Sequence, residues 1–148
     1  MAAATAATRF LAFLAPAEED ALLAAAPVHS YASDQLVFEQ NVSLRAIFLI
    51  EAGAVRVERQ DRGAVIPIAV LGAGEFFGEM SFVDGTPTSA RVVADEPTRL
   101  IVIDPATVDA LSTADPGFAG RLYRSIAAIL AERLRLTSAR AYGDQSWG

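Results

Sequence analysis

A short segment around Gly78 and Glu79 carries the residues of this chain that are best suited to chemistry. A glycine between two elements lets the backbone approach a ligand closely, and free N–H groups at the start of the helical turn that follows attract an anion. A carboxylate such as Glu79 accepts hydrogen bonds from sugar hydroxyls, as acids do in dinucleotide sites. The pattern indicates a site for a ligand with a negative charge and a sugar, although a purely structural turn would explain the same residues.

The residues from 74 to 93 have the organisation that such a site requires. They predict a strand, the glycine, about one turn of helix, a tight turn at Asp84-Gly85-Thr86-Pro87 and a further strand. The elements on either side would have to hold this segment in place.

Short β-prone runs separated by turn residues fill residues 31–104. Regular short strands of this kind predict a mainly β fold, as an antiparallel sandwich or a jelly roll. Pro67 lies inside one run and indicates an edge strand or a bulge, because proline cannot donate to a sheet. The runs are 36–38, 47–50, 55–58, 65–71, 92–93 and 100–103.

Helices are predicted at both ends of the chain. Residues 8–26 indicate two short helices, and Asp104 followed by Pro105 is typical of a capped helix start. A longer helix is predicted over residues 116–140, where apolar residues recur from Leu122 to Leu136 with the helical period. This stripe is wide enough to contact both the chain's own sheet and a second copy, but an ordinary helix packed only on its own sheet remains an alternative.

Composition excludes several classes of protein. The 148 residues carry a formal net charge of −6, which argues against a nucleic-acid partner. The absence of cysteine excludes disulfides and thiolate metal sites and fits the cytoplasm. No stretch of apolar residues is long enough to span a membrane, and the alanine-rich start is a poor fit to a secretory signal.

The segment resembles the phosphate-binding cassette of cyclic nucleotide-binding domains, the family of catabolite activator proteins and protein kinase A regulatory subunits. Phe77-Gly78-Glu79, Gly85-Thr86-Pro87 and Ser89-Ala90 stand at the spacing of that cassette, here residues 76–91, and the likeness extends from residue 10 to residue 140. The resemblance implies an eight-stranded antiparallel jelly roll with short N-terminal helices and a long C-terminal helix.

The resemblance also implies roles for individual residues. Gly78, Met80 and Ser81 would offer groups to the phosphate, and Glu79 would bind the ribose 2′-hydroxyl. Thr137 and Ser138 resemble a Thr-Ser pair that reaches the adenine, one residue from each subunit, although polar residues near a helix end would look the same. The residues expected at the ligand are Phe77, Gly78, Glu79, Met80, Ser81, Thr88, Ser89, Thr137 and Ser138.

Position 88 departs from the family pattern. The family places an arginine there, which pairs with the cyclic phosphate, and this chain has Thr88. Losing one partner of such a pair costs about 2–5 kcal/mol of binding free energy. Arg91, three residues further along a strand, is expected on the opposite face and therefore not to replace it. Asp34 and Asn41 stand where the family has turn glycines, and both residue types tolerate positive φ.

Other sites are weaker on the sequence. The only histidine, His29, stands just before the first predicted strand and is expected to be a surface or capping residue rather than a metal or haem ligand. Tyr142 and Trp147 could close over a bound base, but a loose tail explains them better. No nucleophile–base pair is apparent, so we expect no enzyme activity, no catalytic residue and no metal.

These observations predict one domain over residues 1–148 that works as a sensor. We expect a cyclic nucleotide ligand, cAMP rather than cGMP, and no other cofactor. Its partners would be a second copy, bound through the C-terminal helix, and an effector protein that the sequence does not identify. We expect no DNA-reading segment after Ser138, no nucleic acid and no membrane. The alternative is a scaffold with the same fold that binds no nucleotide.

Overall fold

The computed structural model describes residues 12–142, and for residues 137–142 it describes the backbone alone. Eight strands form two four-stranded antiparallel sheets, with strand orders β1-β8-β3-β6 and β2-β7-β4-β5. The strands are β1 Val28–Tyr31, β2 Leu36–Phe38, β3 Ile47–Ala52, β4 Ala54–Asp61, β5 Ala64–Gly72, β6 Phe76–Phe77, β7 Arg91–Ala94 and β8 Thr98–Ile103. The helices are α2 Pro16–Ala25, α3 Glu79–Asp84, α4 Pro105–Ala114 and α5 Phe118–Tyr142. The predicted jelly roll with a long C-terminal helix is confirmed.

The first strand is the one that the sequence pattern missed. β1 begins at Val28, three residues before the predicted boundary, and its His29 pairs with Leu100 of β8. The expectation that His29 precedes the first strand was therefore wrong. β1 is an edge strand with mostly exposed side chains, so it lacks the alternation of apolar and polar residues on which the prediction depends.

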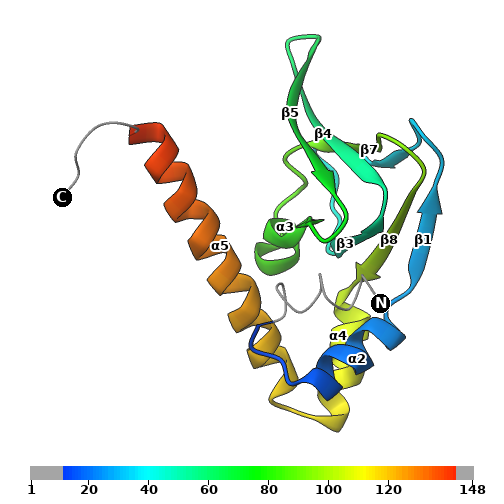
Figure 1. The fold of residues 1–148 in the computed structure, drawn as a ribbon, viewed down its shortest axis with the longest axis vertical. Coiled ribbons are helices and arrows are strands. Elements are labelled where there is room, and N and C mark those ends of the chain that lie inside the picture. The colour runs from blue at the N-terminus through cyan, green and yellow to red at the C-terminus, as the bar shows by residue number, and fades with distance from the viewer. Residues whose placement is uncertain (1–11, 143–148) are drawn as a thin grey trace.

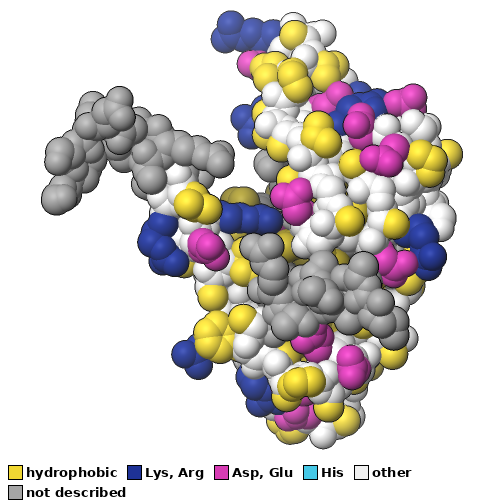
Figure 2. Space-filling model, in the orientation of Figure 1, with side chains coloured by type: hydrophobic (Ala, Val, Ile, Leu, Met, Phe, Trp, Pro, Cys, Tyr) yellow, Lys and Arg dark blue, Asp and Glu magenta, His cyan; other side chains and the backbone are white. Residues whose placement is uncertain are grey.

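The β4–β5 hairpin extends from the end of the roll that is opposite α2 and α4 (Figure 1). Its turn residues Arg62 and Gly63 both have positive φ, 54° and 81°, as a two-residue hairpin turn requires. Pro67 pairs with Glu58 while Ala69 pairs with Val57, so the extra residue between them forms a bulge on an edge strand. Both parts of the prediction for Pro67 are confirmed. Hydrophobic side chains are exposed over this hairpin (Figure 2).

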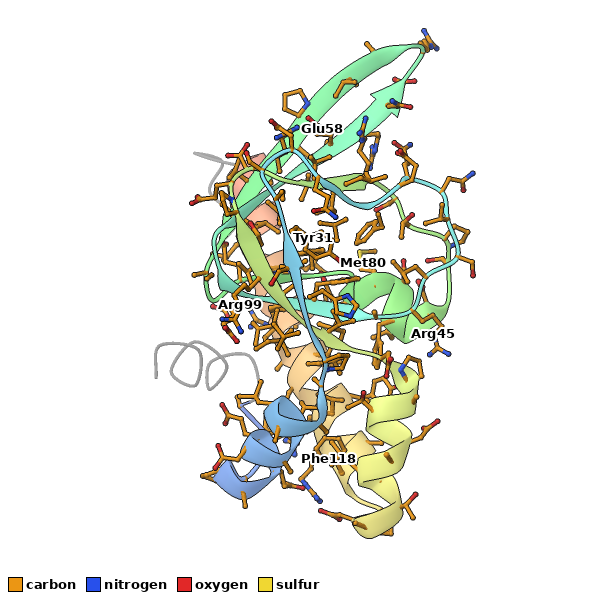
Figure 3. All side chains as sticks on the ribbon, turned by 90° about the vertical axis from the view of Figure 1, so that its right-hand side faces the viewer. Tyr31, Arg45, Glu58, Met80, Arg99 and Phe118 are labelled. Carbon is orange, nitrogen blue, oxygen red and sulfur yellow. The ribbon has the colours of Figure 1, made fainter. Side chains whose placement is uncertain are left out.

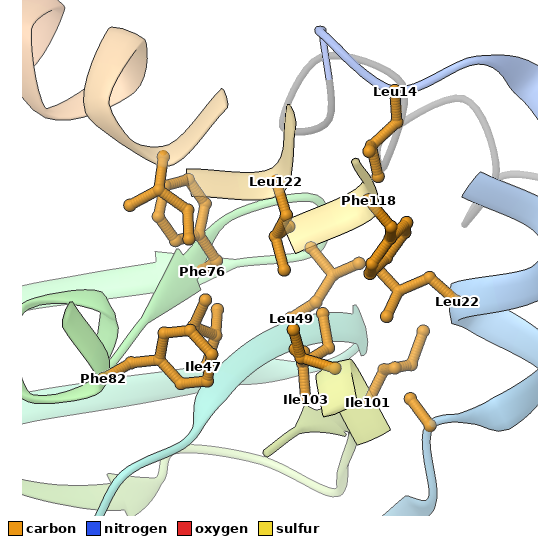
Figure 4. Packing of buried hydrophobic residues seen from close by; sticks show 13 residues of the cluster. Leu14, Leu22, Ile47, Leu49, Phe76, Phe82, Ile101, Ile103, Phe118 and Leu122 are labelled. Atoms are coloured by element: carbon orange, nitrogen blue, oxygen red, sulfur yellow. The ribbon is translucent and has the colours of Figure 1, made fainter. Parts of the chain in front are cut away.

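β3 and β8 are buried on both faces, and this gives the domain two apolar cores. One face of β3, with Ile47 and Leu49, packs against the helices, and the other, with Phe48 and Ile50, packs between the two sheets. Figure 4 shows the first core, in which α2, α3 and α5 contribute Leu22, Phe82 and Leu122. Phe118 closes this core at the end where α2 and α4 lie (Figure 3). An unbroken apolar run such as 47–50 is what a strand buried on both faces needs.

The helix α5 divides into two parts along its length. The first part buries Leu122 and Ile126, which is only 1% exposed, in the core of the same chain. Further along, Leu134 is 67% exposed and Leu136 is exposed as well. The predicted stripe therefore packs on the chain's own core at one end. At the other end Leu134 and Leu136 are exposed on different faces of the helix, because residues two positions apart do not share a face. Asp104 caps α4 by accepting a hydrogen bond of 2.8 Å from the Thr107 N–H, as the sequence predicted.

Of the two helices predicted over residues 8–26, the structure describes α2, while a helix before residue 12 lies outside the described residues. Glu18 of α2 binds Arg121 of α5 through both carboxylate oxygens and also accepts from the N–H of Ala15 at 2.9 Å. The hydrogen bond from Arg121 lowers the pKa of Glu18 to about 2, and the Ala15 N–H adds to the effect. Asp115, between α4 and α5, shares the same guanidinium. This cluster holds the N-terminal helix against the base of α5.

We expect Glu18→Gln to lower the melting temperature at pH 7, because the amide loses the ion pair with Arg121. A carboxyl whose pKa is depressed in the folded state stabilises the fold above its unfolded pKa, 4.5, and loses that contribution as the pH falls toward about 2. The difference in melting temperature from the wild type should therefore shrink over that pH range. Thermal denaturation followed by circular dichroism measures it, with Asp20→Asn on the exposed side of the same helix as control. A deficit that does not change with pH would contradict the assignment.

Candidate ligand-binding site

The turn between β6 and α3 is built around Gly78. Its φ of 85° lies in the left-handed region, and a Cβ atom on it would lie 2.5 Å from the carbonyl oxygen of Ala46. Only glycine fits this position, because any side chain would meet a backbone atom. At the other end of α3, Gly85 also has positive φ, 72°, and its N–H donates to the Ser81 carbonyl at 2.9 Å. The two glycines fix where the six-residue helix begins and ends.

A cavity of about 400 Å³ lies beside this turn. The cassette segment, residues of β2, β4, β5 and β7, and one residue of α5 form its walls. The predicted site residues that line it are Phe77, Gly78, Glu79, Met80, Ser81, Thr88 and Ser89. Residues that the sequence analysis did not assign to a site also line it: Phe38, Val57, Ile68, Ala69, Leu71, Glu75, Phe76, Ala90, Val92 and Arg133. The volume lies in the range of small-molecule sites.

The predicted base contacts Thr137 and Ser138 are on α5, but their side chains lie outside the described residues. Tyr142 is the last residue of the same helix and its side chain is equally outside them, and Trp147 lies beyond the described chain. Met80 is on α3 with its side chain 61% exposed, near the centre of Figure 3.

Glu79 is buried at the cavity wall and is paired. Its Oε1 accepts a hydrogen bond of 2.7 Å from Nη1 of Arg133, while Nη2 of the same arginine donates to the Phe76 carbonyl at 3.3 Å. The Cζ atom of Arg133 lies 4.2 Å from the centre of the Phe76 ring, where a cation is attracted by the ring face. Arg133 lines the cavity and was not assigned to the site from the sequence. Its position four residues before Thr137 places both on one face of the helix, and this spacing could have indicated it.

Thr88 lines the cavity, but its hydroxyl is engaged with the backbone. This residue is 7% exposed, and its Oγ1 donates to the Glu39 carbonyl at 2.7 Å and accepts from the Val42 N–H at 3.0 Å. The backbone of Thr88 adds hydrogen bonds to Asn41 and Val42, so this residue fastens the end of the cassette to the segment between β2 and β3. The turn at Asn41 has the positive φ that was expected there, 63°, as has Asp34, at 68°.

We expect Thr88→Val to lower the free energy of unfolding by about 1–3 kcal/mol, because it removes the acceptor of the Val42 N–H in a partly buried hydrogen bond. Thr86→Val, in the exposed turn two residues earlier, should change it by less than about 0.5 kcal/mol. Urea denaturation measures both. If the two substitutions cost the same, the hydrogen bonds of Thr88 are not what holds the cassette end.

Arg91 faces away from the cavity, as its position in the strand predicted. Its neighbours Ala90 and Val92 line the cavity. The Nε atom of Arg91 instead lies 3.8 Å from Oε1 of Glu39 and 3.7 Å from Oε1 of Glu58. The charge that position 88 lacks is therefore not supplied from this strand.

Within residues 12–142, no three histidine, cysteine or acidic side chains are grouped to hold a metal ion. In the same part of the chain, no helix is both long and apolar enough to cross a membrane.

The geometry defines a β-roll with a cavity that is lined by a short helix and by Arg133 of the last helix. Residues 28–115 match the model of the cyclic nucleotide-binding domain. The chain belongs to the cyclic nucleotide-binding domain family.

Two curated relatives and one solved structure illustrate the likeness. The chain is 37% identical over 123 residues to the cyclic AMP receptor protein of Thermus thermophilus. The matched region covers 82% of this chain and 55% of that protein. It is 35% identical over 115 residues to cyclic GMP-binding protein C of Dictyostelium discoideum, covering 77% of this chain and 4% of that protein. The crystal structure of the Thermus thermophilus catabolite activator protein matches with a TM-score of 0.76 and 33% identity, over 90% of this chain and 61% of that one. The chain thus spans only part of the length of these relatives.

Proposed function

We propose that this protein is a sensor that binds a cyclic nucleotide, cAMP in preference to cGMP, in the cavity between the cassette and α5. The observation that carries the proposal is that the cassette residues from Phe77 to Ser81, together with Ser89, converge on one cavity of about 400 Å³ in a chain of this family. Of the two relatives described above, the one that is matched over the larger share of its own length is named a cyclic AMP receptor protein. This supports cAMP as the first ligand to test. The cysteine-free composition favours the cytoplasm as its compartment.

In this proposal the walls of the cavity have separate tasks. Glu79 accepts the ribose 2′-hydroxyl, since a buried carboxylate is a strong acceptor. The Ser81 and Ser89 hydroxyls and the backbone at Gly78 face the phosphate. The apolar side chains of Val57, Leu71 and other strand residues cover the base. The chemistry is recognition without a covalent step, because among the described residues that line the cavity no histidine stands beside a serine.

The second part of the proposal concerns α5. Its outer turns expose Leu134 and Leu136 after the inner turns have packed on the chain's own core. We propose that the face of α5 that carries Leu134 contacts the same helix of a second copy and that the pair passes the signal to an effector protein. A leucine that is 67% exposed on a long helix, as Leu134 is, is a residue that helix pairing would bury.

The competing candidate is a scaffold that keeps the fold and works through protein contacts alone. Two observations favour it: Thr88 stands in place of the family's arginine, and the carboxylate of Glu79 is already occupied by Arg133. If the cavity has no strong site for phosphate, the protein would act only through contacts between its surface and other proteins.

Calorimetric titration with cAMP, cGMP and 2′-deoxy-cAMP separates the two candidates. The sensor proposal expects saturable binding of cAMP, weaker binding of cGMP, and at least tenfold weaker binding of 2′-deoxy-cAMP, which lacks the hydroxyl assigned to Glu79. A flat titration with all three at millimolar concentration would exclude the sensor and leave the scaffold. Equal affinity for cAMP and its 2′-deoxy form would exclude the role given to Glu79.

A further inference from the structure

The charges that line the cavity are few, and most of them are negative. Among the described residues, Glu75 and Glu79 are acidic and Arg133 is the only basic side chain in the lining. A monoanionic phosphate that entered a cavity with two carboxylates and no cation would meet net repulsion. The charge balance of the cavity therefore depends on Arg133.

The other arginines near the cassette are engaged away from the cavity. Arg45 donates to the Phe82 carbonyl from Nε at 3.2 Å and from Nη2 at 2.8 Å, at the end of α3. Arg91 lies between Glu39 and Glu58 on the outer face of its sheet. Neither side chain lines the cavity, so neither is placed to neutralise a ligand there.

Arg133 is placed so that it can serve a ligand. Its side chain is 42% exposed and reaches from α5 to the cavity wall, where it rests on the Phe76 ring and binds Glu79. The two hydrogen bonds to Glu79 and to the Phe76 carbonyl leave the guanidinium with N–H donors to spare. A planar guanidinium matches two phosphate oxygens with a pair of parallel N–H groups.

We propose that Arg133 provides the positive charge for the ligand phosphate, in place of the arginine that position 88 lacks. This inference rests on the proposed function of the cavity. The arriving phosphate draws the guanidinium away from Glu79, and the carboxylate released in this way accepts the sugar hydroxyl. Because Arg133 belongs to α5, the charge of the ligand then acts directly on the helix that carries the exposed leucines.

The test compares cAMP binding by the wild type with that of Arg133→Gln, Arg133→Lys and Arg135→Gln. Arg135 lies two residues away on the same helix and is exposed, so its variant removes the same charge without reaching the cavity. We expect Arg133→Gln to weaken cAMP binding at least tenfold, Arg133→Lys to recover part of the loss, and Arg135→Gln to stay within about twofold of the wild type. Melting curves establish that each variant is folded.

The salt dependence of binding supplies a second readout that a merely structural role would not change. Wild-type and Arg133→Lys affinity should fall as sodium chloride is raised, and the slope should be smaller in Arg133→Gln. Unchanged or tighter binding by Arg133→Gln would overturn this inference while the proposed function stands. Equal losses in the glutamine and lysine variants with an unchanged salt slope would also overturn it. If the wild type binds no cAMP, both the inference and the proposed function fail.

Discussion

Ile126→Arg should unfold the protein, whereas Leu134→Arg should leave it folded and prevent the helix pairing that we propose. The two residues lie eight positions apart on α5, yet Ile126 is 1% exposed and Leu134 is 67% exposed. An unpaired guanidinium at position 126 would have to enter the core formed with Leu22, Phe76 and Ile103. The cost should be at least ~4 kcal/mol, in the range of the most damaging single substitutions.

Denaturation followed by circular dichroism and size measurement by light scattering distinguish the two effects. Leu134→Arg should melt within a few degrees of the wild type, and at tens of micromolar it should scatter as a monomer where the wild type scatters as a dimer. A folded Ile126→Arg protein would contradict the placement of this residue in the core. A wild-type protein that is monomeric at this concentration would contradict the proposed pairing.

Gly78→Ala should destabilise the domain and remove ligand binding, while Gly85→Ala should cost little. Both glycines have positive φ, so each substitution lowers the unfolding free energy by about 1 kcal/mol or somewhat more because alanine disfavours the left-handed conformation. They differ in their surroundings, because a methyl at Gly85 meets nothing within 4 Å and a methyl at Gly78 meets the Ala46 carbonyl oxygen at 2.5 Å. That oxygen belongs to the backbone and cannot rotate away.

We therefore expect Gly78→Ala to lose at least ~3 kcal/mol of unfolding free energy, or to fold with a displaced cassette that binds cAMP at least tenfold more weakly. Urea denaturation and calorimetric titration measure the two outcomes. If Gly78→Ala and Gly85→Ala prove equally stable and bind equally well, the close approach of the cassette turn to β3 has no role in shaping the site.

The sequence predicted the elements whose signal is local. The strands β3, β4, β5 and β8 are β-prone runs bounded by turn residues, and Asp104 followed by Pro105 marks the start of α4. The sequence pattern did not predict β1, because its side chains are mostly exposed and its pairing partner β8 lies some seventy residues away in sequence. A strand that is held by distant pairing has no local pattern to reveal it.

The long helix illustrates a second limit. Its apolar period predicted one stripe, but the period alone does not say how far the sheet beneath it extends. The structure shows that the packing of α5 on the core of the domain ends between Ile126 and Leu134. The same helix carries Arg133, whose contact with Glu79 joins residues 54 positions apart and depends on the angle at which α5 crosses the roll.

The cassette shows the opposite case, in which a departure from a pattern had a structural explanation. Thr88 looked like a loss of function when only its side-chain charge was considered. In the fold its hydroxyl bridges Glu39 and Val42, a role that depends on a chain segment more than forty residues away. Such a contact is invisible until the two segments are placed side by side.

If a cyclic nucleotide occupies the cavity beside Gly78 and contacts Arg133, its binding should change the environment of α5. Backbone amide chemical shifts of the isotope-labelled protein, recorded by NMR during titration with cAMP, test it most directly. We expect saturable shift changes at Gly78, Ser81, Ser89 and Ala90, together with changes on α5 around Arg133. Amides that do not move at millimolar cAMP, or movements confined to residues far from this cavity such as those of β1, would contradict it.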